Sequence, residues 1–196
     1  MSAASPFDGP SARELQRRRT RARLYDAALA EFARVGLDRA NVATIAREAG
    51  VSRPSFYFHF PTKEHVLLEL QWRKEQEVAD RVRPCADLPS ALRALAEALV
   101  DAFQAIGSRE VARDMLRIYA RRPPELALDD QEFPLMQVLG AHFLAAERRG
   151  ELREGIGPER ATTLCLSSVF GYLLSTALPF AEVREDLRCL VGLYLR

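Results

Sequence analysis

The chain has little of the chemistry that catalysis or metal binding requires. Its 196 residues include only three histidines and three cysteines. Their spacing matches neither a zinc site nor a disulfide framework. The sequence also contains no nucleophile elbow, P-loop or dinucleotide-binding motif. We therefore expect that the protein is not an enzyme and that it holds neither a metal nor any other cofactor.

Targeting segments are also lacking. Residues 1–9 do not combine a basic flank with an apolar run, as a signal peptide would. The most apolar stretch, residues 161–181, is interrupted by serines, threonines and Pro179, which disfavours a membrane helix. The cysteines at 85, 165 and 189 fit a reducing compartment. We expect a cytoplasmic protein with no membrane partner.

The chain lacks a strong excess of either charge, with a net charge of +1. That balance argues against a general binder of polyanions. The distribution is uneven, because residues 1–65 hold eleven Lys or Arg against seven Asp or Glu. The remainder is therefore mildly acidic. A local basic excess is what contact with nucleic-acid phosphates requires.

Apolar residues recur at three- and four-residue spacing along most of the chain, and no run alternates with period two for long enough to form a strand. The sequence therefore predicts an all-α fold of about nine helices. Outside the short helices near residues 42–60, the expected helices span residues 13–35, 63–83, 89–106, 110–120, 133–149, 158–178 and 182–194.

The segment from Ile45 to Lys63 carries the most informative pattern. An apolar stripe of about two helical turns ends at Gly50, and glycine adopts a positive φ without steric cost. Ser52 is a good N-cap for a second helix, and Pro54 is tolerated in its first turn. Two short helices joined by a tight glycine turn form a helix-turn-helix, whose second helix enters the DNA major groove.

Residues 23–68 resemble the DNA-binding domain of the TetR (tetracycline-repressor) family of bacterial transcriptional regulators. Asn41 and Val42 stand where a Thr pair is common in the family, and Ser55 replaces a usual Thr. Asn and Ser keep the capacity for hydrogen bonding. The matching positions are Ala27-Ala28, Phe32, Gly36, Ile45-Ala46, Ala49-Gly50-Val51-Ser52, Ser55-Phe56-Tyr57, Phe58-His59-Phe60, Lys63-Glu64 and Leu67.

Arg53 is the main candidate for reading a base, because its guanidinium can donate to O6 and N7 of guanine. A phosphate contact or a solvated arginine is the alternative. Thr44 and Ser55 are further candidates for base edges. Asn41, Ser52 and Pro54 lie at helix starts and complete the expected DNA-binding set.

Tyr57, His59 and Lys63 are expected to donate hydrogen bonds to phosphates, and the resemblance implies the same contacts. A half-core tyrosine and a capping histidine are the alternatives. The basic run from Arg17 to Arg23 is a further candidate for phosphate or minor-groove contact. We expect Phe56, Phe58 and Phe60 to be core residues.

The sequence predicts a disordered arm over residues 1–12, the helix-turn-helix domain over 13–66 and a helical domain over 67–196. Residues 164–173 are apolar or small on nearly all sides, which favours burial against a second copy of the chain, as in TetR dimers. A buried central helix of a monomer is the alternative. The expected dimer interface comprises Leu164, Ser168, Gly171, Tyr172, Leu187, Leu190, Val191 and Tyr194.

The resemblance also implies an effector cavity in the C-terminal helices. Its Phe, Met and Leu content suggests an apolar or aromatic effector that releases a dimeric repressor from a palindromic operator. Candidate lining residues are Leu70, Leu95, Leu99, Phe103, Met115, Tyr119, Met136, Phe143 and Phe170. A helical ligand carrier, or a redox sensor using Cys85, Cys165 or Cys189, is the alternative that does not act through DNA.

Overall fold

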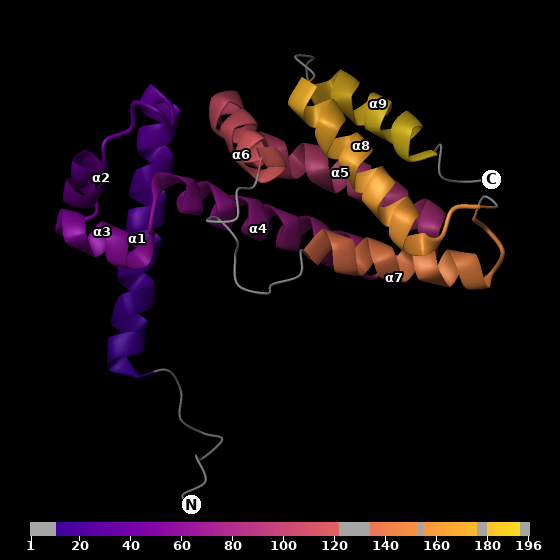
Figure 1. Ribbon diagram of the computed structural model, residues 1–196, viewed down its shortest axis with the longest axis horizontal. Helices are drawn as coiled ribbons and strands as arrows, with labels where there is room; N and C mark the ends of the chain where they lie inside the picture. The colour runs from indigo at the N-terminus through magenta and orange to yellow at the C-terminus, as the bar shows by residue number, and fades with distance from the viewer. Residues whose placement is uncertain (1–10, 122–133, 153–154, 176–179, 193–196) are drawn as a thin grey trace, which may run out of the picture. The chain divides into compact units, whose positions relative to one another are not determined.

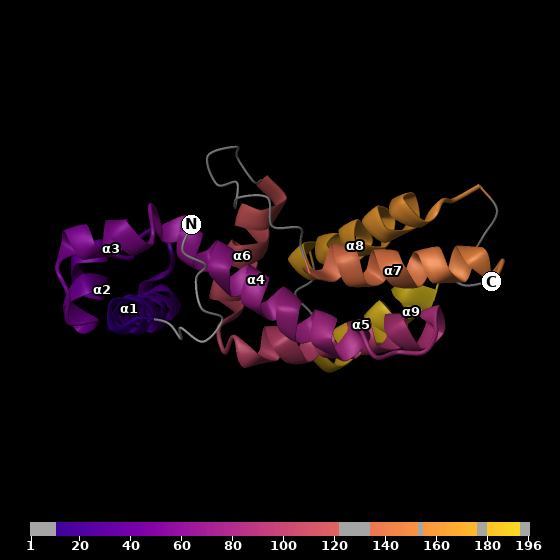
Figure 2. The same cartoon turned by 90° about the horizontal axis from the view of Figure 1, so that it is seen from below.

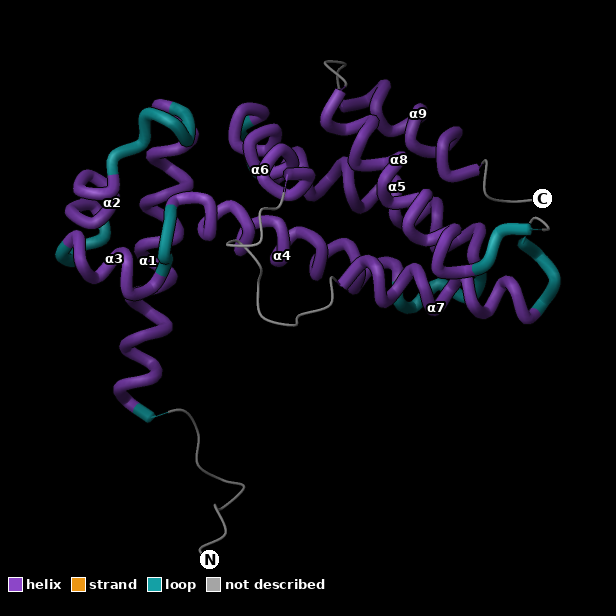
Figure 3. Tube along the Cα trace, viewed as in Figure 1, coloured by secondary structure: helices purple, strands orange, loops and turns teal. Residues whose placement is uncertain are grey.

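Every regular element in the described part of the chain is an α-helix (Figure 3). The computed structural model describes residues 11–121, 134–152, 155–175 and 180–192. Nine helices lie in these ranges, which confirms the all-α fold. The arm expected over residues 1–12 lies almost wholly outside them.

The observed helix bounds agree with the expected ones to within two residues wherever they can be compared. The expected helix ends at 178 and 194 lie outside the described residues. The helices are α1 (Ala12–Val35), α2 (Val42–Glu48), α3 (Arg53–His59), α4 (Lys63–Val82), α5 (Leu88–Ala105), α6 (Arg109–Arg121), α7 (Pro134–Arg148), α8 (Pro158–Ser175) and α9 (Phe180–Gly192) (Figure 1).

The contacts divide the chain into two units, residues 1–66 and residues 67–196, and the division falls inside α4. In the first unit, α2 packs against both α1 and α3. Phe32 of α1, Ile45 of α2 and Phe56 of α3 are at most 1% exposed and form its core. Three short apolar faces are thus enough to fix the two helices of the helix-turn-helix on α1.

In the second unit, α5 packs against α9 and α7, while α8 packs against α7, α9 and α6 (Figure 2). Ion pairs tie α9 to α5. The Asp101 carboxylate accepts from Arg184 at 2.8 Å and from Arg81 of α4 at 2.7 Å. Hydrogen bonds from Arg184 and then Arg81 lower the pKa of Asp101. Arg188 of α9 donates to Glu97 of α5 at 2.7 Å.

The apolar segment at 161–181 raised the question of a membrane helix. Within the described residues, no helix is both long and apolar enough to cross a bilayer.

Candidate nucleic-acid interface and effector cavity

The turn between α2 and α3 is closed by two backbone hydrogen bonds. Val51 N donates to Ala46 O at 2.9 Å, and Gly50 N donates to Arg47 O at 3.0 Å. Together they form a Schellman motif, which requires a left-handed residue after the helix. Gly50 supplies it with φ of +67°. An added Cβ would have ordinary contact distances there, the nearest atom being Arg23 Nη1 at 3.6 Å. Backbone conformation, not space, therefore favours glycine.

The start of α2 is fixed from both sides. The Asn41 side chain accepts from Ala43 N at 2.8 Å, so it acts as the N-cap. The backbone N–H of Asn41 donates to Glu31 of α1 at 3.5 Å. Glu31 is only 7% exposed and also accepts from Arg34 at 2.6 Å. The cap side chain is therefore already committed to the helix, while Asn41 as a whole remains exposed.

Helix α3 has a distinct inner and outer face. Arg53, Pro54 and Tyr57 are exposed, and Phe56 is fully buried. The Arg53 guanidinium carbon lies 5.7 Å from the centroid of the Tyr57 ring. The structure thus brings together three of the predicted DNA-binding residues on one surface.

The other predicted residues near α3 differ in exposure. Ser52 occupies the N-cap position and is exposed, but among the described residues its side chain makes no capping hydrogen bond. Thr44 and Ser55 are half-buried. Of this group, Ser52 therefore offers a hydroxyl that is not used to hold the helix.

Two expectations for α3 require correction. Phe58, expected in the core, is 70% exposed. His59, expected to face a phosphate, is only 8% exposed. The physical reason is helical register, because Phe56, His59 and Phe60 follow the three- and four-residue spacing of one face and Phe58 does not. Burial, and then the charges of Arg21 and Arg17, lower the pKa of His59 below 6.5.

Lys63 has a structural role that the sequence does not reveal. Its ammonium donates to the backbone carbonyls of Leu37 at 2.7 Å, Asp38 at 3.1 Å and Ala40 at 3.1 Å. An ammonium has three N–H donors, and all three meet acceptors here. Lys63 therefore clamps the turn between α1 and α2 to the start of α4. The predicted phosphate contact would require it to release at least one carbonyl.

Arginines of α1 hold the end of α3. Arg21 donates to the carbonyl of His59, and its guanidinium carbon lies 4.2 Å from the Phe60 ring centroid. Arg17 lies 5.5 Å from the Phe58 ring centroid. The basic run of α1 therefore contacts the end of α3 through cation–π interactions and also adds positive charge there.

These observations converge on a compact helix-turn-helix with basic and aromatic side chains on its outer face. The family described as "Bacterial regulatory proteins, tetR family" matches residues 24–70. Residues 24–70 are a DNA-binding domain of the TetR family. The matched segment contains the whole helix-turn-helix and the Lys63 clamp, whereas Arg17 and Arg21 precede it.

Relatives in the TetR family differ in how much of the chain they match. The regulator EthR of Mycobacterium tuberculosis is 49% identical over 57 residues, which are 29% of this chain and 22% of EthR. This chain thus matches about a fifth of that relative's length. The Escherichia coli regulator UidR is 21% identical over 179 residues, covering 88% of this chain and 91% of UidR.

Solved structures extend the likeness to the whole TetR fold. Thermus thermophilus FadR, a repressor solved in complex with lauroyl-CoA, has a TM-score of 0.68 and 23% identity. The match covers 90% of this chain and 96% of that one. At this identity the likeness shows the fold of the second unit, and the ligand of FadR belongs to FadR.

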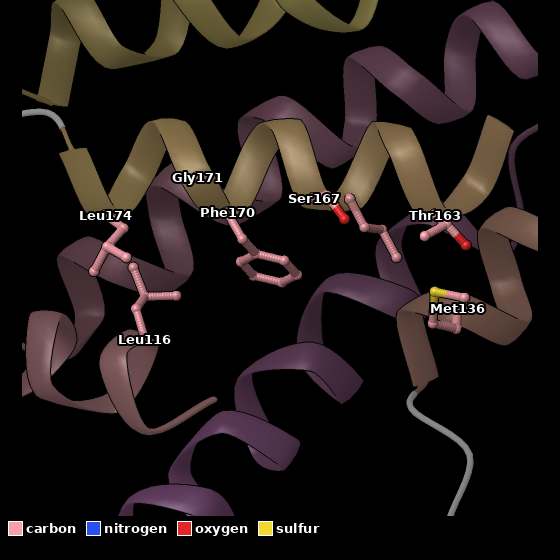
Figure 4. A pocket seen from close by; sticks show the side chains of 8 residues that line it. Leu116, Met136, Thr163, Ser167, Phe170, Gly171 and Leu174 are labelled. Atoms are coloured by element: carbon pink, nitrogen blue, oxygen red, sulfur yellow. The ribbon is translucent and has the colours of Figure 1, made fainter. Parts of the chain in front are cut away.

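A cavity of about 340 Å³ lies within the second unit (Figure 4). Figure 4 shows the Phe170 ring projecting from α8 into this space. Most lining side chains are apolar, with two hydroxyls from α8. The Thr163 hydroxyl donates to Glu159 O at 3.0 Å. The cavity is lined by Leu116 of α6, Met136 of α7, and Thr163, Leu166, Ser167, Phe170, Gly171 and Leu174 of α8.

Only Met136 and Phe170 of the predicted lining residues line this cavity. The expected residues Leu70, Leu95, Leu99, Phe103, Met115 and Phe143 are core residues, each at most 7% exposed. The side chain of Tyr119 lies outside the described part. Leu116 of α6 and five residues of α8 were not predicted. The α8 residues recur at three- and four-residue spacing, which is a signal that the sequence contains. Of these residues, only Gly171 is also among those expected in the dimer interface.

The predicted dimer residues have mixed environments. Leu164 is 42% exposed, Gly171 is exposed, and Ser168 and Tyr172 are half-buried. Tyr172 donates to Asp186 of α9. Leu187 is a correction, because it is fully buried within its own chain. The side chains of Leu190 and Val191, and all of Tyr194, lie outside the described part.

The cysteines differ in accessibility. Cys165 is fully buried, and burial raises the pKa of its thiol to about 12. Because the thiolate is the reactive form, this residue is an inert core side chain. Cys85 is half-buried and Cys189 is exposed.

Proposed function

We propose that this chain is a dimeric, sequence-specific DNA-binding transcriptional regulator that represses from a palindromic operator in the cytoplasm. The observation that carries the proposal is the outer face of α3. There Arg53 and Tyr57 are exposed side by side on a helix whose inner face is buried. This arrangement matches what a recognition helix needs in order to enter the major groove.

In the proposed complex, Arg53 donates to a guanine edge and Tyr57 donates to a phosphate. The stacking of the Arg53 guanidinium near the Tyr57 ring keeps the two groups on the same surface. Arg17 adds charge beside α3. Contacts to phosphates fix the position of the helix, and the contact to the base edge gives sequence preference. Ser52 contributes an exposed hydroxyl at the start of the helix.

Two-fold symmetry is the second part of the proposal. A two-fold symmetric dimer places two recognition helices on two half-sites, so its operator should be palindromic. The exposed Leu164 and Gly171 on α8 support an interface along that helix. Small and apolar residues there allow close approach of a second helix.

The third part is release by an effector. The cavity of about 340 Å³ lies at the lower end of the usual range for small-molecule sites. Its lining favours a compact apolar or aromatic compound that can meet the hydroxyl groups of Thr163 and Ser167. Such a compound weakens DNA binding only as far as it prefers the conformation that does not bind DNA.

To test this proposal, duplex DNA of randomised sequence is selected for binding to the full-length protein near physiological salt, and the retained DNA is sequenced. An enriched inverted repeat supports a dimeric sequence-specific regulator. An enriched single half-site supports DNA reading and contradicts the symmetric dimer. Absence of enrichment, before and after refolding to remove bound small molecules, contradicts the DNA-binding function. In that case, a ligand-carrier function becomes the better explanation of the cavity.

A further inference from the structure

Phe58 is an apolar side chain that the fold itself does not require. At 70% it is the most exposed large apolar residue of the described chain. The inward positions of α3 are filled by Phe56 and Phe60, which are fully buried. A polar residue at position 58 would leave that core intact. Core packing therefore does not account for this ring, and most of its surface is open to a partner.

Phe58 lies on the outer face of α3, which is proposed to enter the major groove. Arg53, Pro54, Tyr57 and Phe58 are all exposed. At 3.6 residues per turn these four residues fall within about 140° of the helix circumference. Phe58 therefore shares one face with the two side chains assigned to a base and a phosphate.

The ring is restrained although it is exposed. It meets the His59 ring edge to face, with the centroids 5.2 Å apart. The Arg17 guanidinium carbon lies 5.5 Å from the Phe58 centroid. These contacts limit the directions in which the ring can point. Arg17 also brings a positive charge next to the ring, which favours an anionic partner at this surface.

We propose that Phe58 contacts the 5-methyl group of a thymine in the major groove and thereby makes each operator half-site dependent on that thymine. This inference rests on the proposed DNA-binding function. The thymine methyl is the apolar group that a phenylalanine can recognise among the edges of the base pairs. The groove provides apolar contact at the methyl and anionic phosphates around it, which suits a phenylalanine beside Arg17.

The test uses uracil, which pairs like thymine but lacks the 5-methyl group. The operator obtained by selection is resynthesised with uracil replacing one thymine at a time, at the symmetric positions of both half-sites. Binding by the full-length wild-type protein and by Phe58→Ala is then measured. One methyl contact corresponds to about fourfold in affinity for one half-site, and about 15-fold for both.

We expect the wild type to lose this affinity at one thymine position. Phe58→Ala should bind the thymine and uracil operators equally and more weakly than the wild type. Leu144→Ala is the matched control, because Leu144 is an apolar residue 39% exposed in the second unit. It should discriminate like the wild type. Equal thermal unfolding of Phe58→Ala and wild type will show that the exposed ring is not needed for folding.

If Phe58→Ala binds too weakly to measure, Phe58→Leu replaces it, with a uracil effect smaller than in the wild type. A selected operator at which uracil never weakens wild-type binding overturns this inference alone. The same holds if Phe58→Ala retains the full uracil effect. Failure to select any sequence overturns the proposed function and this inference with it.

Discussion

The two units of the chain differ in how far individual residues can be assigned a function. The family match, residues 24–70, lies mostly in the first unit, where the outer face of α3 presents side chains whose partners follow from the chemistry of a DNA groove. In the second, a relative matched over most of the chain is only 21% identical, and the structure offers a cavity with mostly apolar walls. A partner of fixed shape constrains residue types at fixed positions. A variable small ligand requires only that helices pack around a space.

The largest expected effect comes from truncating one buried side chain in each of the two units. Ile45 in the first unit and Leu95 in the second are both fully buried. Ile45→Ala and Leu95→Ala should each lower the free energy of unfolding by about 2–5 kcal/mol, because each leaves a cavity. The chain's one tryptophan, Trp72, lies in the second unit. In urea titrations, Leu95→Ala should move the transition followed by Trp72 fluorescence to lower urea. Ile45→Ala should leave that transition in place and move mainly the one followed by circular dichroism.

Identical shifts of both signals by both substitutions would contradict this prediction. They would mean that the two units unfold as one cooperative body.

Removal of one arginine from each unit has the next largest expected effect. Arg53→Ala should remove discrimination of about 1–3 kcal/mol at one base pair of each half-site. Binding to variant operators measures this. Arg117→Ala removes an arginine of α6 whose side chain is 60% exposed, and it should leave DNA binding unchanged. If Arg53→Ala instead weakens all sequences alike and lowers the salt dependence, Arg53 contacts a phosphate.

The Lys63 clamp separates a structural role from DNA contact. Lys63→Met should destabilise the first unit by about 1–3 kcal/mol, because three backbone carbonyls lose their donor. Lys63→Arg keeps the charge, but a planar guanidinium cannot reproduce the three bonds of an ammonium. The unfolding temperature should therefore fall for both variants. DNA binding is measured as well. If its salt dependence is lower for Lys63→Met but unchanged for Lys63→Arg, Lys63 also contacts a phosphate.

The smallest expected effect is on pH dependence. Burial is the largest cause that lowers the pKa of both His59 and His65, which lie in the first unit. As pH falls below about 6.5, the unfolded state takes up protons before the folded state does. The free energy of unfolding should therefore decrease on acidification through that range. His59→Gln should weaken this dependence, and histidine resonances in NMR titrations should give the two pKa values directly.

A rise in stability on acidification through the same range would contradict the prediction for the histidines. Protonation of carboxylates such as Asp101, whose pKa is lowered, acts at more acidic pH and is separable from it.

Periodicity and turn chemistry were enough to predict the helices, because each depends on neighbours in sequence. Gly50 is an example, since its positive φ follows from the short spacing between α2 and α3. The environment of single side chains in α3 was harder to predict. Three phenylalanines within five residues suggest a core, but helical register exposes Phe58 and buries His59. The carbonyl contacts of Lys63 could not be predicted, because its acceptors lie more than twenty residues earlier in the chain.

The cavity was the least predictable feature. Leu116, Met136 and Phe170 come from three helices, and only their packing decides which apolar side chains face a space. Leu95 and Phe143 carry the same chemical signal in the sequence but are fully buried. An apolar helical stripe therefore indicates burial without indicating whether a ligand can share it.

The Lys63 clamp also allows opening of the turn between α1 and α2 to be followed by chemical labelling. All but two of the 28 basic residues are arginine, so amine-reactive labels find few targets besides Lys63 and Lys74. Lys63 can react only after its amine leaves the three carbonyls of the turn between α1 and α2. The rate of labelling at this one site, read by mass spectrometry, therefore measures how often that turn opens in the intact protein.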